Sequence, residues 1–409
     1  MDSTMKPPGL SDEPGLLAAL VELSRTYGAN PELVIAGGGN TSVKFDDHLL
    51  VKASGAALSS IGPDGFVDLD RAALQTLLDT DLSTSRKERE AGFRQAVMAA
   101  RREPDRMHRP SIESVLHHLM PNRFVVHLHA TLVNEFSCCR EGYHLVEGEL
   151  GDDVVWVPHV DPGFALAKAL QQQLRAFQLR TGRDRPRAVV LENHGLVVAG
   201  ERPTEVSGHI EWLLQRLSEI KARASVGSPR GAGQHAVRGL EARALSVRVA
   251  HALADLLSTA DEPPKVLDFD NSDVVVDFVT SDNGRDLAMG GPVTPDQIVY
   301  CRSFPLWIAT SPGEPADDLE RRLEAAVSEY STLFHTRPSV VLVQGLGLFA
   351  AGDAWPEAST ARLVYVDTIK VMTGASRMGG VNYLNEDFIT FIENWEAQSY
   401  RRYVSRTSA

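Results

Sequence analysis

The chain has 409 residues, of which 43% are hydrophobic and 23% are charged. This composition can bury a large core, and it excludes intrinsic disorder and a small disulfide-stabilised scaffold. The 54 acidic residues outnumber the 41 basic residues, and the net charge of -13 disfavours nucleic acid and anionic membranes as partners. A small molecule is therefore the expected partner.

The cysteine content and the apolar runs indicate the compartment. Three cysteines, two of them adjacent at Cys138 and Cys139, cannot build the disulfide framework of a secreted domain. The first residues lack the apolar core of a signal peptide, and no apolar run approaches the roughly 18 residues that span a membrane. We expect a cytoplasmic protein with no membrane contact.

The first half of the chain mixes helix and strand patterns. The segment LVIAGGGNTSVKF (33–45) indicates a strand, a glycine-rich turn and a second strand. The expected helices cover 16–27, 70–79, 85–102, 111–119, 164–182 and 203–224, and the other expected strands lie within 48–55, 123–130, 153–157 and 186–200.

Residues 226–238 combine Gly, Pro, Ser and charge, which is typical of a connection between domains. We therefore expect a first domain over 1–225, a linker over 226–238 and a second domain over 239–409. In the second domain the patterns predict helices at 239–258, 315–334, 358–373 and 385–403, and strands near 265–279, 297–309 and 338–351. Both domains are expected to be α/β.

Two segments of the two halves align without a gap: PRAVVLENHGLVVAG (186–200) and PSVVLVQGLGLFAAG (338–352). This similarity indicates an internal duplication, although apolar strands that end in glycine also look alike by composition. Because His194 aligns with Leu346, a duplicated second half would be degenerate and would lack the polar site of the first.

Three histidines are candidate metal ligands. His127 and His129 stand two residues apart in a strand pattern, so their side chains point to the same face. His194, followed by Gly195, supplies a third imidazole from a distant part of the chain. Catalytic zinc commonly takes three protein ligands and keeps one position open. Taken alone, a pair of histidines on a strand is more often structural.

Glu113, near the start of a predicted helix, is the candidate acid/base. A carboxylate there also has a structural explanation, because it interacts favourably with the helix dipole. Next to a metal ion, however, a carboxylate can exchange protons with the substrate while the cation stabilises developing negative charge.

A run of glycines and polar residues, Gly37 to Ser42, is a candidate anion site, because successive glycine amides and hydroxyls can converge on a phosphate. The run matches neither the Walker nor the dinucleotide-binding pattern, and by itself it also fits a tight hairpin turn. Further candidates for anion binding are Ser54, Gly55, Ser111 and the lysines Lys44 and Lys52.

Taken together, GGGNTSVK, SG (54–55), PSIE (110–113), HLHA (127–130) and ENHGLVVAG (192–200) resemble the class II aldolase/adducin family over about residues 15–225. Farther along, TPDQIVYCRSFPLWI (294–308) and FIENWEAQSYRR (391–402) resemble the aldolase portion of bifunctional rhamnulose-1-phosphate aldolase/alcohol dehydrogenases. No second glycine-rich dinucleotide motif accompanies them.

The resemblance implies a three-layer αβα fold and a divalent metal, usually Zn²⁺, held by His127, His129 and His194, with Glu113 as the acid/base. It implies cleavage of a ketose 1-phosphate, similar to rhamnulose or fuculose phosphate, into dihydroxyacetone phosphate and a short aldehyde through a metal-stabilised enediolate. Adducin-like scaffolds of the family lack the full histidine set, so an enzyme is expected.

The resemblance also implies phosphate contacts from Asn40, Ser54, Gly55 and Ser111, to which local context adds Gly39, Thr41 and Lys52. The family commonly has two serines before the acidic residue, whereas this chain has Ser111 followed by Ile112, so one phosphate donor is lost. Two alternatives stay open: Lys52 compensates for the lost donor, or the substrate carries a carboxylate instead of a phosphate.

Three alternatives remain: a sugar-phosphate epimerase, a keto-acid decarboxylase and a noncatalytic adducin-like interaction module. The resemblance further implies a homo-oligomer, a tetramer among the options.

Overall fold

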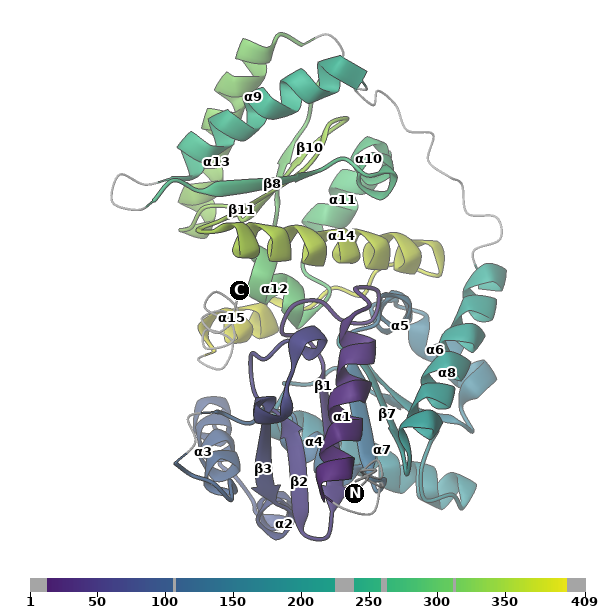
Figure 1. Ribbon diagram of the computed structural model, residues 1–409. Coiled ribbons are helices and arrows are strands. Elements are labelled where there is room, and N and C mark those ends of the chain that lie inside the picture. The colour runs from purple at the N-terminus through teal and green to yellow at the C-terminus, as the bar shows by residue number, and fades with distance from the viewer. Residues whose placement is uncertain (1–12, 106–107, 225–238, 259–262, 312–313, 396–409) are drawn as a thin grey trace, which may run out of the picture. The chain divides into compact units, whose positions relative to one another are not determined.

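The computed structural model describes residues 13–105, 108–224, 239–258, 263–311 and 314–395. The chain divides into two compact units (Figure 1). The first unit runs to Ser137 and continues over Tyr143–Lys221, whereas the second combines Cys138–Gly142 with the chain from Ala222 onward. The expected linker, 226–238, lies outside the described residues.

The first unit contains a mixed seven-stranded sheet with the order β3-β2-β1-β4-β7-β6-β5. Its strands are β1 (Asn40–Phe45), β2 (His48–Lys52), β3 (Phe66–Asp70), β4 (Phe124–Leu128), β5 (Val154–Val157), β6 (Ala188–Leu191) and β7 (Gly195–Gly200). Its helices are α1 (Glu13–Gly28), α2 (Arg71–Asp79), α3 (Arg86–Ala99), α4 (Ser114–Leu119), α5 (Thr131–Ser137), α6 (Gly142–Leu150), α7 (Phe164–Thr181) and α8 (Pro203–Ala224), with short 3₁₀ turns at Leu58–Ser60 and Pro63–Gly65.

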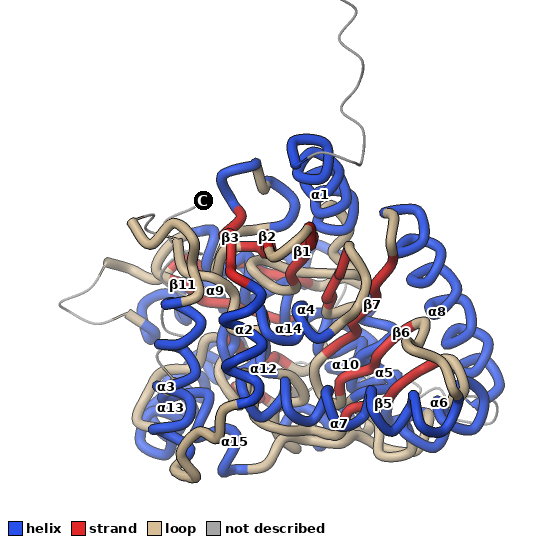
Figure 2. The backbone as a smooth tube through the Cα atoms, turned by 90° about the horizontal axis from the view of Figure 1, so that it is seen from below, coloured by secondary structure: helices blue, strands red, loops and turns tan. Residues whose placement is uncertain are grey.

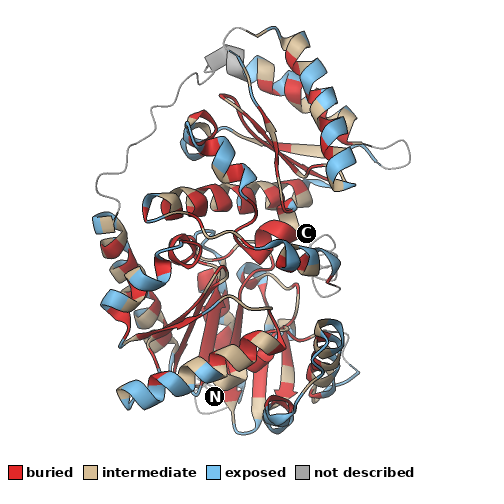
Figure 3. Cartoon of the chain, turned by 180° about the vertical axis from the view of Figure 1, so that it is seen from behind, coloured by how far each residue is buried: buried red, intermediate tan, exposed pale blue. Residues whose placement is uncertain are grey.

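Helices cover both faces of this sheet, which gives the expected three layers (Figure 2). Helices α2, α3, α4 and α7 pack on one face, where apolar side chains of the strands and helices form two continuous clusters. Helices α1 and α8 lie on the other face, where the Tyr27 hydroxyl of α1 donates to Ser207 of α8 at 2.9 Å. The strands are accordingly buried along nearly their whole length (Figure 3).

Strand β4 is the central element for the site, because it pairs antiparallel with β1 on one side and with β7 on the other. The register places Asn40 opposite His127 across the first pair and Val197 opposite His127 across the second. Only β5 and β6 of this sheet run parallel to each other.

The second unit contains a four-stranded sheet with the order β8-β11-β10-β9. Its strands are β8 (Val266–Asp270), β9 (Leu306–Ile308), β10 (Val340–Val343) and β11 (Gly347–Gly352). Its helices are α9 (Gly239–Leu257), α10 (Asp273–Thr280), α11 (Gly284–Met289), α12 (Pro295–Cys301), α13 (Ala316–Phe334), α14 (Trp355–Arg377) and α15 (Glu386–Asn394). Helices α9 and α13 share an apolar core with the strands.

The second sheet repeats part of the first, because β8-β11-β10-β9 has the same order and the same strand directions as β4-β7-β6-β5. The starting residues of β6, β7 and α8 are Ala188, Gly195 and Pro203, and those of β10, β11 and α14 follow at one constant interval: Val340, Gly347 and Trp355. We infer that this repeat of topology reflects the internal duplication that the alignment indicates.

Three strand predictions were wrong. Residues 33–35 form no strand, because β1 already has partners on both sides, β2 and β4, and the chain turns at Ala36 with φ 51°. Residues 273–279, expected as strand, form α10, which buries Val275, Phe278 and Val279 at helical spacing. Residues 297–301 belong to α12, which begins at Pro295 and is capped by the Thr294 side chain. Tertiary packing overrides the β-propensity of both segments.

The segment Cys138–Gly142 groups with the second compact unit, although the chain on both sides of it belongs to the first. The backbone of this segment bonds to other residues of the second unit: the Asn382 N–H donates to the Cys138 carbonyl at 2.8 Å, and the Arg140 N–H donates to the Gly380 carbonyl at 2.9 Å.

All three cysteines are buried free thiols. None of the helices in the described part of the chain is long and apolar enough to cross a membrane.

The sheet of the first unit depends on Phe124, which is fully buried in β4. We expect Phe124→Ala to lower the free energy of unfolding of this unit by about 3–5 kcal/mol, because the substitution removes buried contacts and leaves a cavity. Urea denaturation followed by circular dichroism measures the change. Leu179→Ala, at an 80% exposed position of α7, is the control and should stay within about 0.5 kcal/mol of the parent.

Candidate metal centre

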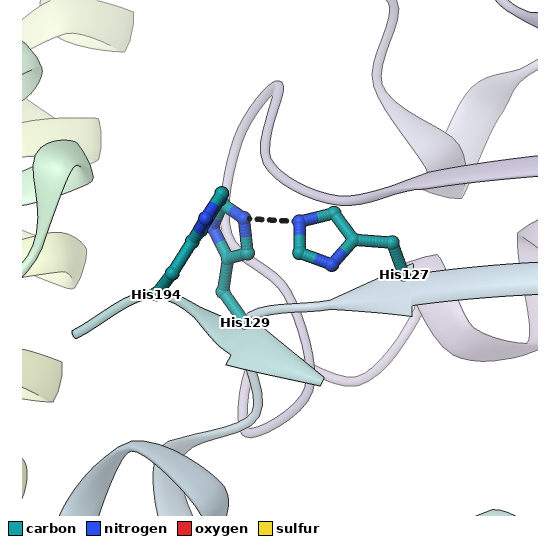
Figure 4. A group of neighbouring side chains, drawn as sticks. All are labelled: His127, His129 and His194. Atoms are coloured by element: carbon teal, nitrogen blue, oxygen red, sulfur yellow. Dashed lines mark hydrogen bonds between the residues drawn. The ribbon is translucent and has the colours of Figure 1, made fainter. Parts of the chain in front are cut away.

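Three imidazoles converge at the end of β4. His127 lies on β4, His129 follows the end of the strand, and His194 lies in the turn between β6 and β7. Their possible ligand atoms all lie within 4.8 Å of one another, and the rings point toward a common centre (Figure 4). The Nε2 atoms of His127 and His129 are 3.0 Å apart. We call these residues the histidine cluster; in the described part of the chain no other group of His, Cys, Asp or Glu has this geometry.

The backbone around His194 explains how a distant residue reaches β4. Asn193 takes a left-handed conformation with φ 55°, which closes the turn between β6 and β7. A Cβ atom at Gly195 would lie 2.3 Å from the Leu128 carbonyl oxygen, so glycine is required for close approach to β4. The left-handed residue of this turn is thus Asn193, and Gly195 serves the close approach of the two strands.

His127 presents its Nε2 atom to the cluster. Its Nδ1–H donates to the Leu196 carbonyl at 2.9 Å, which fixes the tautomer and leaves the Nε2 lone pair for a ligand. Burial of the ring lowers the pKa of His127 well below its ordinary value, against the opposing effect of Glu113. His129 and His194 are only partly buried. Three imidazole nitrogens grouped in this way suit a divalent cation such as zinc.

Glu113 faces the histidine cluster. It occupies the residue before α4, but its side chain does not cap that helix. Its Oε1 atom lies 3.1 Å from Nε2 of His194 and 3.5 Å from Nε2 of His127. Burial opposes ionisation, yet the neighbouring imidazoles hold the pKa of Glu113 well below its usual range. Contact with the cluster, not the helix dipole, therefore explains the position of this carboxylate.

Asn40 and Ser111 join the same group. The Asn40 amide donates to Glu113 Oε2 at 2.6 Å and to the Ser111 hydroxyl at 3.2 Å. The Ser111 hydroxyl also accepts from the Glu113 backbone N–H at 3.2 Å. Both amide hydrogens of Asn40 thus bond to protein groups, so Asn40 holds the carboxylate in addition to any contact with a substrate.

Ser54, Gly55 and Gly39 are candidate anion-binding residues that lie next to the segments of Glu113 and His127. Ser54 and Gly55 form a turn alongside the Glu113 segment, because Ala53 bridges to Pro110 and the Ser54 N–H donates to Arg109. Gly39, with φ 59°, allows β1 to approach the His127 carbonyl, which would lie 2.7 Å from a Cβ atom.

Thr41 and Lys52 are directed differently from the expectation. The Thr41 hydroxyl bonds to Ser24 of α1 at 2.6 Å, on the opposite face of β1 from Asn40, which removes it from the site. Lys52 Nζ donates to the carbonyls of Gly37 and Ala56, so it braces the glycine-rich turn. The Gly38 N–H is used inside that turn, where it donates to Ile35 at 3.0 Å.

His117, a buried residue of the site, was missed by sequence reasoning, whereas Ser42 is the last residue of the candidate anion-binding run. His117 lies on α4 and bonds to both Asn40 and Ser42. The available signal was the spacing of Glu113 and His117, because residues four apart lie on one face of a helix.

The corresponding positions of the second unit are apolar. Phe269 pairs with Phe349 in the same register in which His127 pairs with Val197, and the two phenyl rings lie 4.6 Å apart. Leu346 occupies the position that aligns with His194 and belongs to the apolar core. Of the two repeated halves, only the first therefore carries candidate metal ligands at these positions.

Metal binding gives a direct prediction. We expect the chelator-treated protein to bind about one Zn²⁺ or Co²⁺ per chain, and His129→Ala to weaken binding by more than about 100-fold because one of three donors is lost. Isothermal titration and elemental analysis measure affinity and stoichiometry. His118→Ala is the control, because His118 contacts Gln75 instead of the cluster; equal affinity of both variants would contradict the site.

Comparison with known proteins gives two family matches. The model of the class II aldolase and adducin N-terminal domain matches residues 18–220, and that of the aldolase class II second domain matches residues 244–401. The uncharacterized oxidoreductase YuxG of Bacillus subtilis (strain 168) is 27% identical over 93% of this chain. The chain spans 57% of the length of that relative.

Solved structures include similar chains. The N-terminal class II aldolase domain of a conserved protein from Thermoplasma acidophilum is 25% identical, with a TM-score of 0.45, over 54% of this chain and 99% of that chain. The L-fuculose-1-phosphate aldolase from Thermus thermophilus is 19% identical, with a TM-score of 0.34, over 52% of this chain and 98% of that chain. From the two family matches, the chain belongs to the class II aldolase/adducin family.

Proposed function

We propose that this chain is a metal-dependent aldolase that cleaves a ketose 1-phosphate, similar to rhamnulose or fuculose phosphate, into dihydroxyacetone phosphate and a short aldehyde. The observation that carries the proposal is the histidine cluster with the Glu113 carboxylate 3.1 Å from His194. The family assignment supports the reaction class, whereas the sugar is our proposal.

In this proposal His127, His129 and His194 hold the cation, most consistently Zn²⁺ given three imidazole donors. When bound, a divalent cation supplies Lewis-acid stabilisation of negative charge on substrate oxygens. Glu113 exchanges a proton with the substrate, since its carboxylate faces the same centre, 3.1 Å from His194.

Ser111, Ser54 and Gly55 are the proposed phosphate contacts. They lie on adjacent segments beside Glu113, joined by the bridge between Ala53 and Pro110. Ser111 Oγ accepts from Asn40 and from Glu113, which leaves its own hydrogen to donate to an anion. Asn40 holds Ser111 and Glu113 by hydrogen bonds, and Gly39 allows the chain to approach His127 closely. We leave Thr41 out of the proposal because its hydroxyl bonds to Ser24.

The cellular setting follows from the same proposal. A sugar phosphate is a substrate of the cytoplasm, and three buried free thiols suit a reducing compartment. We further propose a homo-oligomer, with a tetramer as the arrangement to test, and a noncatalytic role for the second unit, in which apolar residues stand at the positions that correspond to the histidine cluster.

The test is a panel of sugar 1-phosphates and sugar acids incubated with the metal-loaded protein. Release of dihydroxyacetone phosphate, detected by a coupled reductase assay, supports the aldolase. An isomerised sugar phosphate would indicate an epimerase, and carbon dioxide would indicate a decarboxylase. A protein that binds no metal and turns over nothing would be a noncatalytic interaction module.

Glu113→Gln tests the proton carrier. We expect unchanged metal stoichiometry and a kcat lowered by about 10²–10⁴-fold, because the amide retains the shape but cannot accept the proton. Steady-state kinetics on the best substrate measures the effect. Glu22→Gln, at an exposed position of α1, is the matched control. Equal turnover in both variants would remove Glu113 from its proposed role.

A further inference from the structure

A chain of buried polar side chains leads from the interior of the first unit to Glu113. It consists of Ser42, His117, Asn40 and Glu113, and we call it the polar chain. Ser42 and His117 are fully buried, and Asn40 and Glu113 are 4% and 8% exposed. Buried polar groups are costly unless each is hydrogen-bonded, so the direction of every bond in this chain matters.

His117 determines that direction. Burial lowers the pKa of His117 to about 3, so the ring is neutral and carries one N–H. Its Nε2 atom contacts Asn40 Oδ1, and its Nδ1 atom lies 2.7 Å from the Ser42 hydroxyl. Because an amide oxygen only accepts, the ring hydrogen is on Nε2, and Nδ1 accepts from Ser42.

The contact with Glu113 supplies an independent reason for this orientation of the Asn40 amide. With Oδ1 held by His117, the amide nitrogen faces Glu113 Oε2 at 2.6 Å and Ser111 at 3.2 Å. The reversed amide would bring its oxygen against the carboxylate, so that two acceptors would meet in a buried space. These contacts give the polar chain one polarity, in which every bond donates toward the Glu113 carboxyl group.

We propose that Ser42 and His117 are positioning residues that fix the Asn40 amide as a donor to Glu113 and so hold this carboxylate at the histidine cluster. This inference rests on the proposed function for the role of Glu113. It adds two residues that belong neither to the histidine cluster nor to the proposed phosphate contacts Ser111, Ser54 and Gly55.

The first test uses kinetics of the metal-loaded protein. We expect His117→Leu to lower kcat by about 10–100-fold, the usual cost of losing the partner that orients a site residue, with KM and metal stoichiometry little changed. His117→Gln should restore most of the rate, because its amide can donate to Asn40 and accept from Ser42. His118→Leu, the next residue on α4, is the control, because it contacts Gln75 and not the polar chain.

A double-mutant cycle separates positioning from general destabilisation. Asn40→Ala removes the connector, so His117→Leu should cause no further loss of kcat in the double variant. If the kcat losses of the two single variants multiply in the double variant, the proposal is overturned. It is also overturned if His117→Gln is as slow as His117→Leu. Ser42→Ala, which deletes one hydroxyl, should lower kcat by roughly 5-fold and provides a milder variant if His117→Leu does not fold.

The second test requires neither metal nor substrate. Nitrogen-15 NMR of histidine-labelled, metal-free protein should give a neutral His117 ring protonated at Nε2, assigned by its absence in His117→Gln. A ring protonated at Nδ1 would overturn the proposal whatever the activity. If Glu113→Gln retains full turnover while this tautomer is found, the proposed function fails, but the polarity of the chain stands.

Discussion

The pairing of β4 with two antiparallel neighbours is the constraint on which the site depends. Through β1 it places Asn40 opposite His127, and through β7 it brings the turn that carries His194 to the end of β4. Gly39 and Gly195 allow both neighbours to approach, since a Cβ atom at either would overlap a carbonyl oxygen of β4. A register shift of one residue would turn His127 to the other face and dissolve the cluster.

The two sheets show that the scaffold does not require this chemistry. The second unit keeps the order, directions and spacing of four strands. At the positions that His127 and His194 occupy in the first unit, however, it has the apolar residues Phe269 and Leu346. A buried group of imidazoles, a carboxylate and amides costs stability unless its bonds are complete, whereas the apolar version needs only packing. Its retention in the first unit therefore points to function.

Local patterns predicted most of the fold and the centre of the site. The histidine pair followed from strand periodicity, and the β-branched segments and capped helices defined most elements. The failures came from contacts distant in sequence. His117 was missed because its partner Asn40 lies 77 residues away. The interpretation of GGGNTS as a turn did not show the direction of Thr41. Because Asn40 already begins β1, alternation turns the Thr41 side chain toward Ser24. Cys138–Gly142 joins the second unit through backbone bonds that side-chain patterns do not encode.

X-ray absorption spectroscopy of the zinc-loaded protein tests the central claim most directly, because it reports the atoms around the metal. We predict a coordination sphere that contains three imidazole nitrogens at about 2.0–2.1 Å, with the remaining position held by oxygen. A sphere of sulfur atoms at about 2.3 Å, or one with oxygen alone, would mean that the three histidines do not bind the cation together, and it would contradict the account.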